Sequence, residues 1–189
     1  MPGTPYDGAL AEFATLRAEV DTRAKFQQQI LALQLTLTTA VVGFAISRPG
    51  MVGLLLAVPL GSYLLCGRYV AQRDAIQRVS SYIAGELSPR IPDGLGWVTY
   101  SVQSPRPGRL LGWFLPLLVS FPGVGLLALV WSFRSLDLAD AVSSGRAGLV
   151  GVWVADLIAT GISGYLLVRV FTDQTAVPAA EPVAADGVR

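Results

Sequence analysis

Four long stretches of this chain are almost free of charged side chains, and this feature restricts the fold more than any other. The intervals 26–47, 49–67 and 110–133 contain no Asp, Glu, Lys or Arg, and the interval 147–168 contains only Asp156. Each interval is close to the roughly 20 residues that cross a hydrocarbon core about 30 Å thick at about 1.5 Å per residue. The sequence therefore predicts four transmembrane helices.

Composition indicates a membrane protein of one domain. Of the 189 residues, 52% are apolar and only 14% are charged, against about 25% charged in an ordinary soluble domain. So few charges cannot cover the surface of a soluble protein of this size. The first apolar stretch begins too late and is too long for a cleaved signal peptide. Stretches that are apolar on all faces also differ from the alternating strands of a membrane barrel.

The predicted fold is all-α, with four transmembrane helices arranged as two hairpins and a cytoplasmic amphipathic helical stalk. Pro59 is expected to kink the second span, and Pro116 and Pro122 are expected to bend the third. The predicted regions, in chain order, are 1–25, a cytoplasmic amphipathic helix; 26–69, a first hairpin with helices at about 26–47 and 51–69; 70–109, a cytoplasmic helical extension and interfacial loop; 110–171, a second hairpin with helices at about 110–133 and 147–171; and 172–189, a disordered tail.

The distribution of basic residues predicts the orientation. Of the 14 Lys and Arg residues, only Arg48, Arg134 and Arg146 fall in the two short loops. The other 11 lie in the N-terminal segment, the central loop and the C-terminal end. Because basic residues favour the cytoplasmic side, both termini are expected in the cytoplasm. The excess of Arg over Lys, with abundant Ala, Gly, Val and Leu, is typical of a GC-rich genome. We therefore expect a bacterial protein in the inner (cytoplasmic) membrane.

The two helices of the expected stalk each carry an apolar stripe at three- and four-residue spacing. These stripes predict that the helix preceding the first span and the extension following the second span pack together as a short antiparallel coiled coil. Glu19 and Arg23 form an i,i+4 pair in the favourable order. The stripe residues are Tyr6, Leu10, Phe13, Val20 and Ala24 before the first span, and Tyr69, Gln72, Ile76, Val79 and Ile83 after the second.

Asp156 is the principal candidate for a functional residue. It lies about nine positions, or roughly 13 Å, from the start of the fourth span, near the expected midplane of the bilayer. An ionisable group at that depth is a functional hypothesis by default. It could be a proton or cation site, a polar lock between helices, or a hydrogen-bonded carboxyl used only for packing. Thr160 lies one turn away, and a row of small residues that permits close helix packing follows four-residue spacing: Gly151, Ala155, Ala159 and Ser163.

Further polar side chains occur in the first span. Gln34 and Thr38 share a face at i,i+4, so they are candidates to line a cavity or to bond Asp156. The alternative is that Gln34 makes one contact between helices and that Thr38 bonds its own backbone.

Other residue types offer little chemistry. The chain has no His and only one Cys, Cys66, for which a packing role is expected. No cofactor and no metal site are therefore expected, and a net charge of +1 gives no indication of nucleic acid binding. Basic residues near the cytoplasmic side are candidates for binding lipid headgroups, although orientation alone would also place arginines there. These residues are Arg68, Arg73, Arg78, Arg106 and Arg109.

Two segments carry a resemblance to known proteins. The run 11–20 with its continuation through 26–29, and the stretch 67–83, resemble small uncharacterised actinobacterial multi-pass integral membrane proteins. The resemblance covers about the first 100 residues and implies no activity and no site. The plan of a cytoplasmic helix followed by a membrane hairpin is also similar to that of membrane-perforating effectors of bacterial defence systems, but this chain has a second hairpin and no recognisable sensor domain.

Three functional hypotheses follow. The first is a non-enzymatic interaction or assembly subunit, whose partners are the lipid bilayer, further copies in a homo-oligomer, or a cytoplasmic protein bound through the stalk. The second is a channel, pore or transporter subunit that uses Asp156 and requires oligomerisation, since four closely packed helices leave no conduit. The third is a membrane-embedded enzyme, for which no paired acidic motif or nucleophile motif is present.

Overall fold

The structure is a computed structural model, which describes residues 7–91, 110–135 and 147–175. Within those residues every regular element is a helix. Four helical runs are long and apolar enough to cross a membrane by length and composition: 7–47, 53–90, 112–135 and 148–172. The prediction of an all-α chain with four such helices is confirmed. The predicted interfacial loop (92–109), the external loop (136–146) and the disordered tail lie wholly or largely outside the described residues.

The first helix, α1 (Asp7–Ser47), has 41 residues without a break. It contains no proline, and several of its threonines bond the carbonyl one turn back, including Thr15 to Ala11 and Thr36 to Ala32. The helix ends at Ser47, and the backbone of the next residue, Arg48, is extended, with φ −137° and ψ 96°. This conformation is expected for a residue that precedes a proline, because the ring of Pro49 disfavours the α region.

The second helical run begins tightly wound and relaxes into an α-helix. It comprises η1 (Pro49–Leu56, a 3₁₀ helix), α2 (Ala57–Tyr82), η2 (Ile83–Leu87, a π-helix) and η3 (Ser88–Arg90, a 3₁₀ helix). Pro59 lies in the first turn of α2, where the missing N–H is tolerated best. The kink expected at Pro59 therefore falls close to the point where the run changes from a 3₁₀ helix to an α-helix. α2 then continues past Tyr69 without a break.

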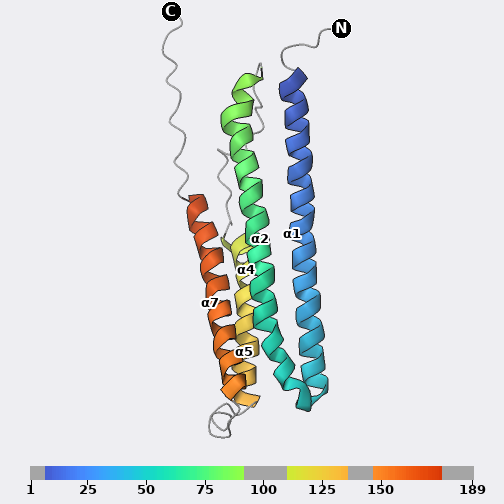
Figure 1. The fold of residues 1–189 in the computed structure, drawn as a ribbon, viewed down its shortest axis with the longest axis vertical. Helices are drawn as coiled ribbons and strands as arrows, with labels where there is room; N and C mark the ends of the chain where they lie inside the picture. Colours follow the sequence, from blue (N-terminus) through green and yellow to red (C-terminus); the bar gives the residue numbers. More distant parts are fainter. Residues whose placement is uncertain (1–6, 92–109, 136–146, 176–189) are drawn as a thin grey trace, which may run out of the picture.

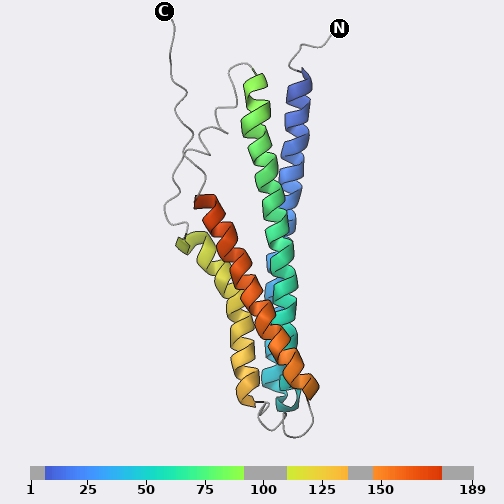
Figure 2. The same ribbon diagram turned by 60° about the vertical axis from the view of Figure 1, so that its left-hand side comes forward.

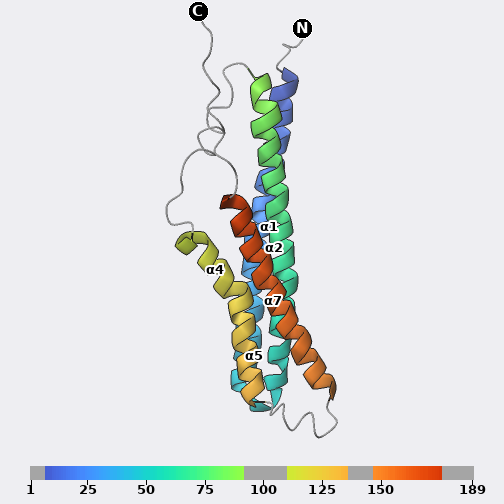
Figure 3. The same ribbon diagram turned by 90° about the vertical axis from the view of Figure 1, so that its left-hand side faces the viewer.

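The third run changes its winding at its prolines. It comprises η4 (Leu110–Phe114, a π-helix), α4 (Leu115–Leu118), η5 (Val119–Gly123, a π-helix) and α5 (Val124–Ser135). Figure 3 shows that α4 is inclined away from the direction of α5, as expected for a helix interrupted by Pro116 and Pro122. The fourth run is a single helix, α7 (Ala147–Thr175).

α2 is the central helix of the arrangement. It packs against α1 along one side and against α5, η5 and α7 on others. α1 and α2 run antiparallel and side by side in all three views (Figures 1–3). The larger apolar core joins α2 to η5 and α7, and in it the rings of Tyr69 and Phe121 have centroids 5.9 Å apart. A second core near the opposite end joins α1, η1, α2 and α5 through Ala45, Leu55, Val58 and Ala128.

One part of the α1–α2 pair extends far beyond the ends of α4 and α7 (Figures 1 and 2). We call residues 7–25 and 72–90 the projecting pair. Side-chain hydrogen bonds cross it, including those from Arg23 Nη1 to Gln72 Oε1 at 3.2 Å and from Tyr82 Oη to Glu12 Oε1 at 2.8 Å. Arg23 Nε also donates to Glu19 at 2.9 Å, which confirms the predicted i,i+4 pair.

Large apolar side chains cover the outer surfaces of the other helices. Leu127 on α5 is 70% exposed, and Ile158 and Tyr165 on α7 are 57% and 65% exposed. Contiguous apolar surface of this kind is rare on soluble proteins. It is the surface that a hydrocarbon environment covers, in agreement with the four apolar helical runs.

Gly125 marks the closest approach of three helices and provides a test of this packing. A Cβ atom there would lie 3.0 Å from Thr160 Oγ1 on α7 and 3.5 Å from Pro59 Cα on α2. We expect Gly125→Val to lower the free energy of unfolding by about 1–3 kcal/mol through overpacking, measured by denaturation in mixed detergent micelles. Gly161→Val on α7 is the matched control, because no neighbouring group lies within 4 Å of the position that its Cβ would take. Equal destabilisation by both substitutions would contradict the packing.

Candidate functional site

Several polar side chains are buried within the helices, and they define the candidate site. Gln34 comes from α1, Ser62 from α2 and Ser132 from α5, and the remainder lie on α7. Their exposed fractions are Gln34 1%, Ser62 2%, Ser132 0%, Asp156 2%, Thr160 9% and Ser163 1%. Because hydrocarbon offers no hydrogen-bonding partner, each of these groups must find one inside the protein or bear the cost of having none.

Gln34 is the most highly connected of them. Its Nε2 atom lies 2.6 Å from Ser62 Oγ and 2.9 Å from the main-chain oxygen of Ser120, and it lies 3.4 Å from Thr38 Oγ1. An amide nitrogen has two hydrogens, so the two short contacts are the hydrogen bonds and the contact to Thr38 is the weakest. One side chain thereby joins α1 to α2 and to η5.

The carbonyl of Ser120 is available because of the local winding of η5. In an α-helix this oxygen would accept from the N–H of Val124. Here that N–H contacts the carbonyls of Val119 and Phe121 instead. Pro122, inside the same π-turn, supplies no N–H of its own. Gln34 therefore satisfies a carbonyl that the helix geometry has released. Sequence reasoning identified Gln34 but missed this partner, for which the nearby Pro122 was the available signal.

The other amide atom of Gln34 remains without a partner. Its Oε1 atom is buried and accepts no hydrogen bond within the described part of the chain. The amide nitrogen of Gln34 does not bond Asp156, because it is directed to Ser62 and Ser120. Gln34 instead makes contacts between helices, which is the alternative interpretation.

Asp156 is buried and only partly satisfied. Its Oδ2 atom has no hydrogen-bond partner among the described residues. The hydroxyl of Thr160 donates to the main-chain oxygen of Asp156 at 2.9 Å, not to its carboxyl group. Ser163 likewise bonds the carbonyl of Ala159, at 3.0 Å. The hydroxyls of α7 are thus satisfied by their own helix, whereas a charged carboxylate in hydrocarbon costs roughly 2.5–3.5 kcal/mol or more.

The predicted row of small residues divides into two parts. Ala159 and Ser163 are buried against the other helices, whereas Gly151 and Ala155 are exposed. A four-residue step overshoots a helical turn by about 40°, so a row at that spacing moves gradually off the packed face. The packed face follows mixed three- and four-residue spacing instead, through Asp156, Ala159 or Thr160, Ser163, Leu167 and Val170.

Cys66 lies in the larger core and is fully buried. Its Sγ atom is 3.8 Å from the main-chain oxygen of Ser163, where α2 and α7 are close together. This position agrees with the expected packing role.

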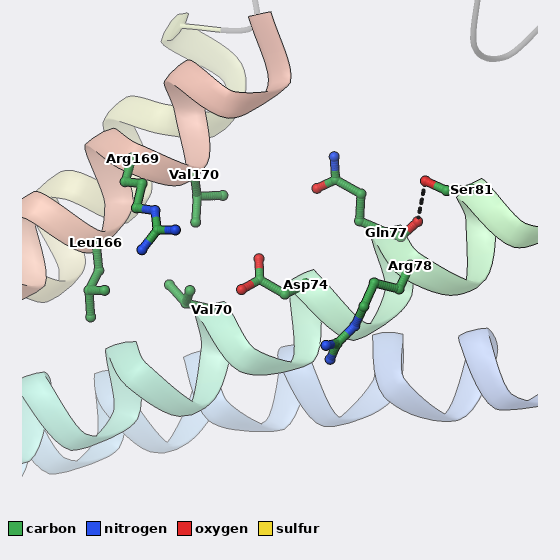
Figure 4. Close-up of a pocket in the computed structure, with 8 residues that line it drawn as sticks. All are labelled: Val70, Asp74, Gln77, Arg78, Ser81, Leu166, Arg169 and Val170. Atoms are coloured by element: carbon green, nitrogen blue, oxygen red, sulfur yellow. Dashed lines mark hydrogen bonds between the residues drawn. The ribbon is translucent and has the colours of Figure 1, made fainter. Parts of the chain in front are cut away.

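The arginines proposed to bind headgroups occupy different environments. Arg73 is stacked on the ring of Trp113, with 3.6 Å from its Cζ atom to the ring centroid. Arg78 borders a pocket between α2 and α7, together with Arg169 (Figure 4). Arg68 is exposed on α2. Arg106 and Arg109 lie outside the described residues.

Comparisons of the chain with protein families, with curated proteins and with solved structures found no match. In the described residues, no group of three or more His, Cys, Asp or Glu side chains is placed to hold a metal ion. The functional proposal below is therefore based on the buried polar groups and on the projecting pair.

The hydrogen bond between Gln34 and Ser62 can be measured by a double-mutant cycle. We expect a coupling energy of about 0.6–1.7 kcal/mol between Gln34→Ala and Ser62→Ala, because each substitution removes one partner of a buried bond. The free energy of unfolding in mixed micelles is the measurement. Thr36→Val is the control: its hydroxyl is exposed and bonds only its own helix, so we expect no coupling with Ser62→Ala. A zero coupling for Gln34 would contradict the geometry.

Proposed function

We propose that this chain is a non-enzymatic membrane protein that functions by assembly, with the projecting pair serving as its contact surface for a second copy. The observation that carries this proposal is the length of α1 and α2. They extend well past the ends of α4 and α7 as a helix pair, and other described helices reach only its base (Figures 1 and 2). Such a pair has a small apolar interior and much free surface.

The proposed orientation places the projecting pair in the cytoplasm. The spans are then about 26–47, 51–69, 110–133 and 147–171, and they form two hairpins in a bacterial inner membrane. Eleven of the 14 basic residues fall on the side of the projecting pair, which supports this assignment through the bias of basic residues toward the cytoplasm. The projecting pair is then the cytoplasmic helical stalk.

The composition of the stalk supports contact between copies. Its two segments, 7–25 and 72–90, contain six acidic and six basic residues, so two copies do not repel each other through net charge. The outer face of α1 presents the exposed small residues Ala11, Ala14 and Ala18. Their spacing of three and four places them on one side of the helix, where small side chains allow another helix to approach closely.

A single introduced thiol can test this contact. The only native cysteine, Cys66, is fully buried, so an added cysteine is the only accessible one. We expect Ala14→Cys to form disulfide-linked dimers in membranes under mild oxidation, because the α1 faces of two stalks would lie together. Non-reducing electrophoresis gives the dimer fraction. Leu127→Cys, at a 70% exposed position on α5, is the control for random collision and should remain monomeric.

Two results would contradict the assembly proposal. One is equal cross-linking of the Ala14→Cys and Leu127→Cys proteins. The other is a single subunit in lipid nanodiscs, as counted by native mass spectrometry, for a chain whose stalk is intact.

A second candidate function rests on Asp156. An intramembrane carboxyl group that is 2% exposed and has one oxygen without a partner is a feature of proton and cation pathways. The close packing of α2, α5 and α7 at Gly125 leaves little room for a conduit there. A pathway would therefore have to lie between copies, so this candidate also requires assembly.

Ion flux decides between a transport role and a packing role for Asp156. If Asp156 carries protons or cations, we expect Asp156→Asn to reduce flux into proteoliposomes at least tenfold, since the amide keeps the shape but cannot hold the charge. A pH-sensitive or cation-sensitive dye inside the liposomes gives the rate. Thr38→Val, in the same membrane region, is the control. Absence of flux in the unaltered protein, or equal flux in the Asp156→Asn protein, would contradict a transport role.

A further inference from the structure

A pocket lies between α2 and α7 where the two helices separate, at the base of the projecting pair (Figure 4). Its volume is about 450 Å³, within the roughly 300–1,000 Å³ typical of small-ligand sites. None of the functional proposals above uses it. Its lining differs strongly from one end to the other, and that difference indicates what it can bind.

The end of the pocket nearer the membrane core is apolar. Val70 of α2 and Leu166 and Val170 of α7 form it. Val70 and Val170 also belong to the larger apolar core, so this end is continuous with the packed interior of the helices. A ligand with a purely ionic character would leave this surface unused.

The opposite end is polar and carries both signs of charge. Asp74, Gln77, Arg78 and Ser81 line it from α2, and Arg169 lines it from α7. In Figure 4 the guanidinium of Arg169 reaches across the gap toward the side of α2 that bears Asp74. The guanidinium of Arg78 is directed toward α1 instead. One guanidinium group beside a carboxylate suits a ligand that has a phosphate and a cationic group close together.

The level of the pocket agrees with that of lipid headgroups. Arg73, the residue before Asp74, is stacked on Trp113 near the start of the third span. Trp and Arg side chains with an apolar body and a polar tip are typical of the membrane–water interface. The polar end of the pocket begins at the same turn of α2. With Arg73 and Trp113 at the interface, the apolar end of the pocket would face the first acyl carbons and its polar end would face the phosphate.

We propose that this pocket binds the headgroup of an aminophospholipid from the leaflet on the basic side of the protein. Arg169 binds the phosphate, Asp74 binds the ammonium group, and Val70, Leu166 and Val170 contact the glycerol and the first acyl carbons. The carboxylate of Asp74 sets the preference, because it disfavours a purely anionic headgroup. The assignment of the leaflet to the cytoplasmic side rests on the orientation proposed above, but the binding itself does not.

Lipid retention in nanodiscs tests the site. The full chain is placed in nanodiscs that contain equal amounts of phosphatidylethanolamine and phosphatidylglycerol, and native mass spectrometry identifies the lipid that stays bound after release. We expect the unaltered protein to retain phosphatidylethanolamine preferentially. Arg169→Gln should lower retention of that lipid about tenfold, since one charge-assisted contact is lost. Asp74→Asn should shift the preference toward phosphatidylglycerol.

Matched controls lie on the same helical run but outside the pocket. Arg90→Gln and Glu86→Gln remove one exposed charge of each sign, and we expect both to retain lipid as the unaltered protein does. Equal losses in the control and pocket variants, or the absence of any lipid preference, would overturn the proposal. Binding of soluble phosphoethanolamine or inorganic phosphate as tightly as the lipid would overturn the membrane source of the ligand.

Discussion

The main-chain oxygen of Ser120 is the group on which the packing of the first three helical runs depends. In the π-turn Val119–Gly123 the N–H of Val124 is directed to other carbonyls, and hydrocarbon contains no water to satisfy the oxygen of Ser120. Gln34 does so at 2.9 Å while also bonding Ser62 at 2.6 Å. One amide group thus determines the depth and rotation of α1 and α2 relative to η5. The close approach at Gly125 then brings α7 to the same centre.

The projecting pair is held differently. Beyond the ends of α4 and α7, α1 and α2 have only each other among the described helices, and polar contacts such as Arg23–Gln72 and Glu12–Tyr82 connect them. Polar contacts that are exposed or only partly buried stabilise weakly compared with fully buried ones. The molecule therefore has a firmly packed part within the apolar helices and a less stable part outside them, and regions that engage other molecules are commonly of the second kind.

The four spans could be predicted because an apolar stretch of about 20 residues without charge is typical of a membrane-spanning helix and rare elsewhere. The third and fourth predicted helices, 110–133 and 147–171, overlap the described apolar helical runs 112–135 and 148–172. The partners of Gln34 could not be predicted, since they depend on the register between helices, and sequence spacing describes only one helix at a time. The row from Gly151 to Ser163 shows the same limit: a regular four-residue spacing rotates away from the packed face, so only its later members are buried.

The two unusual polar groups of the membrane region differ in what surrounds them. The amide nitrogen of Gln34 is used fully for packing, whereas one oxygen of Asp156 is left without a partner. Asp156 and Arg169 lie on the same helix, α7, and Arg169 lines the pocket shared with α2, which also forms half of the projecting pair. A ligand between α2 and α7 therefore contacts the helix that carries the buried carboxyl and the helix that leads into the projecting pair. A lipid that binds better at one spacing of these two helices would favour that spacing, and through α2 it would favour one position of the surface proposed for assembly.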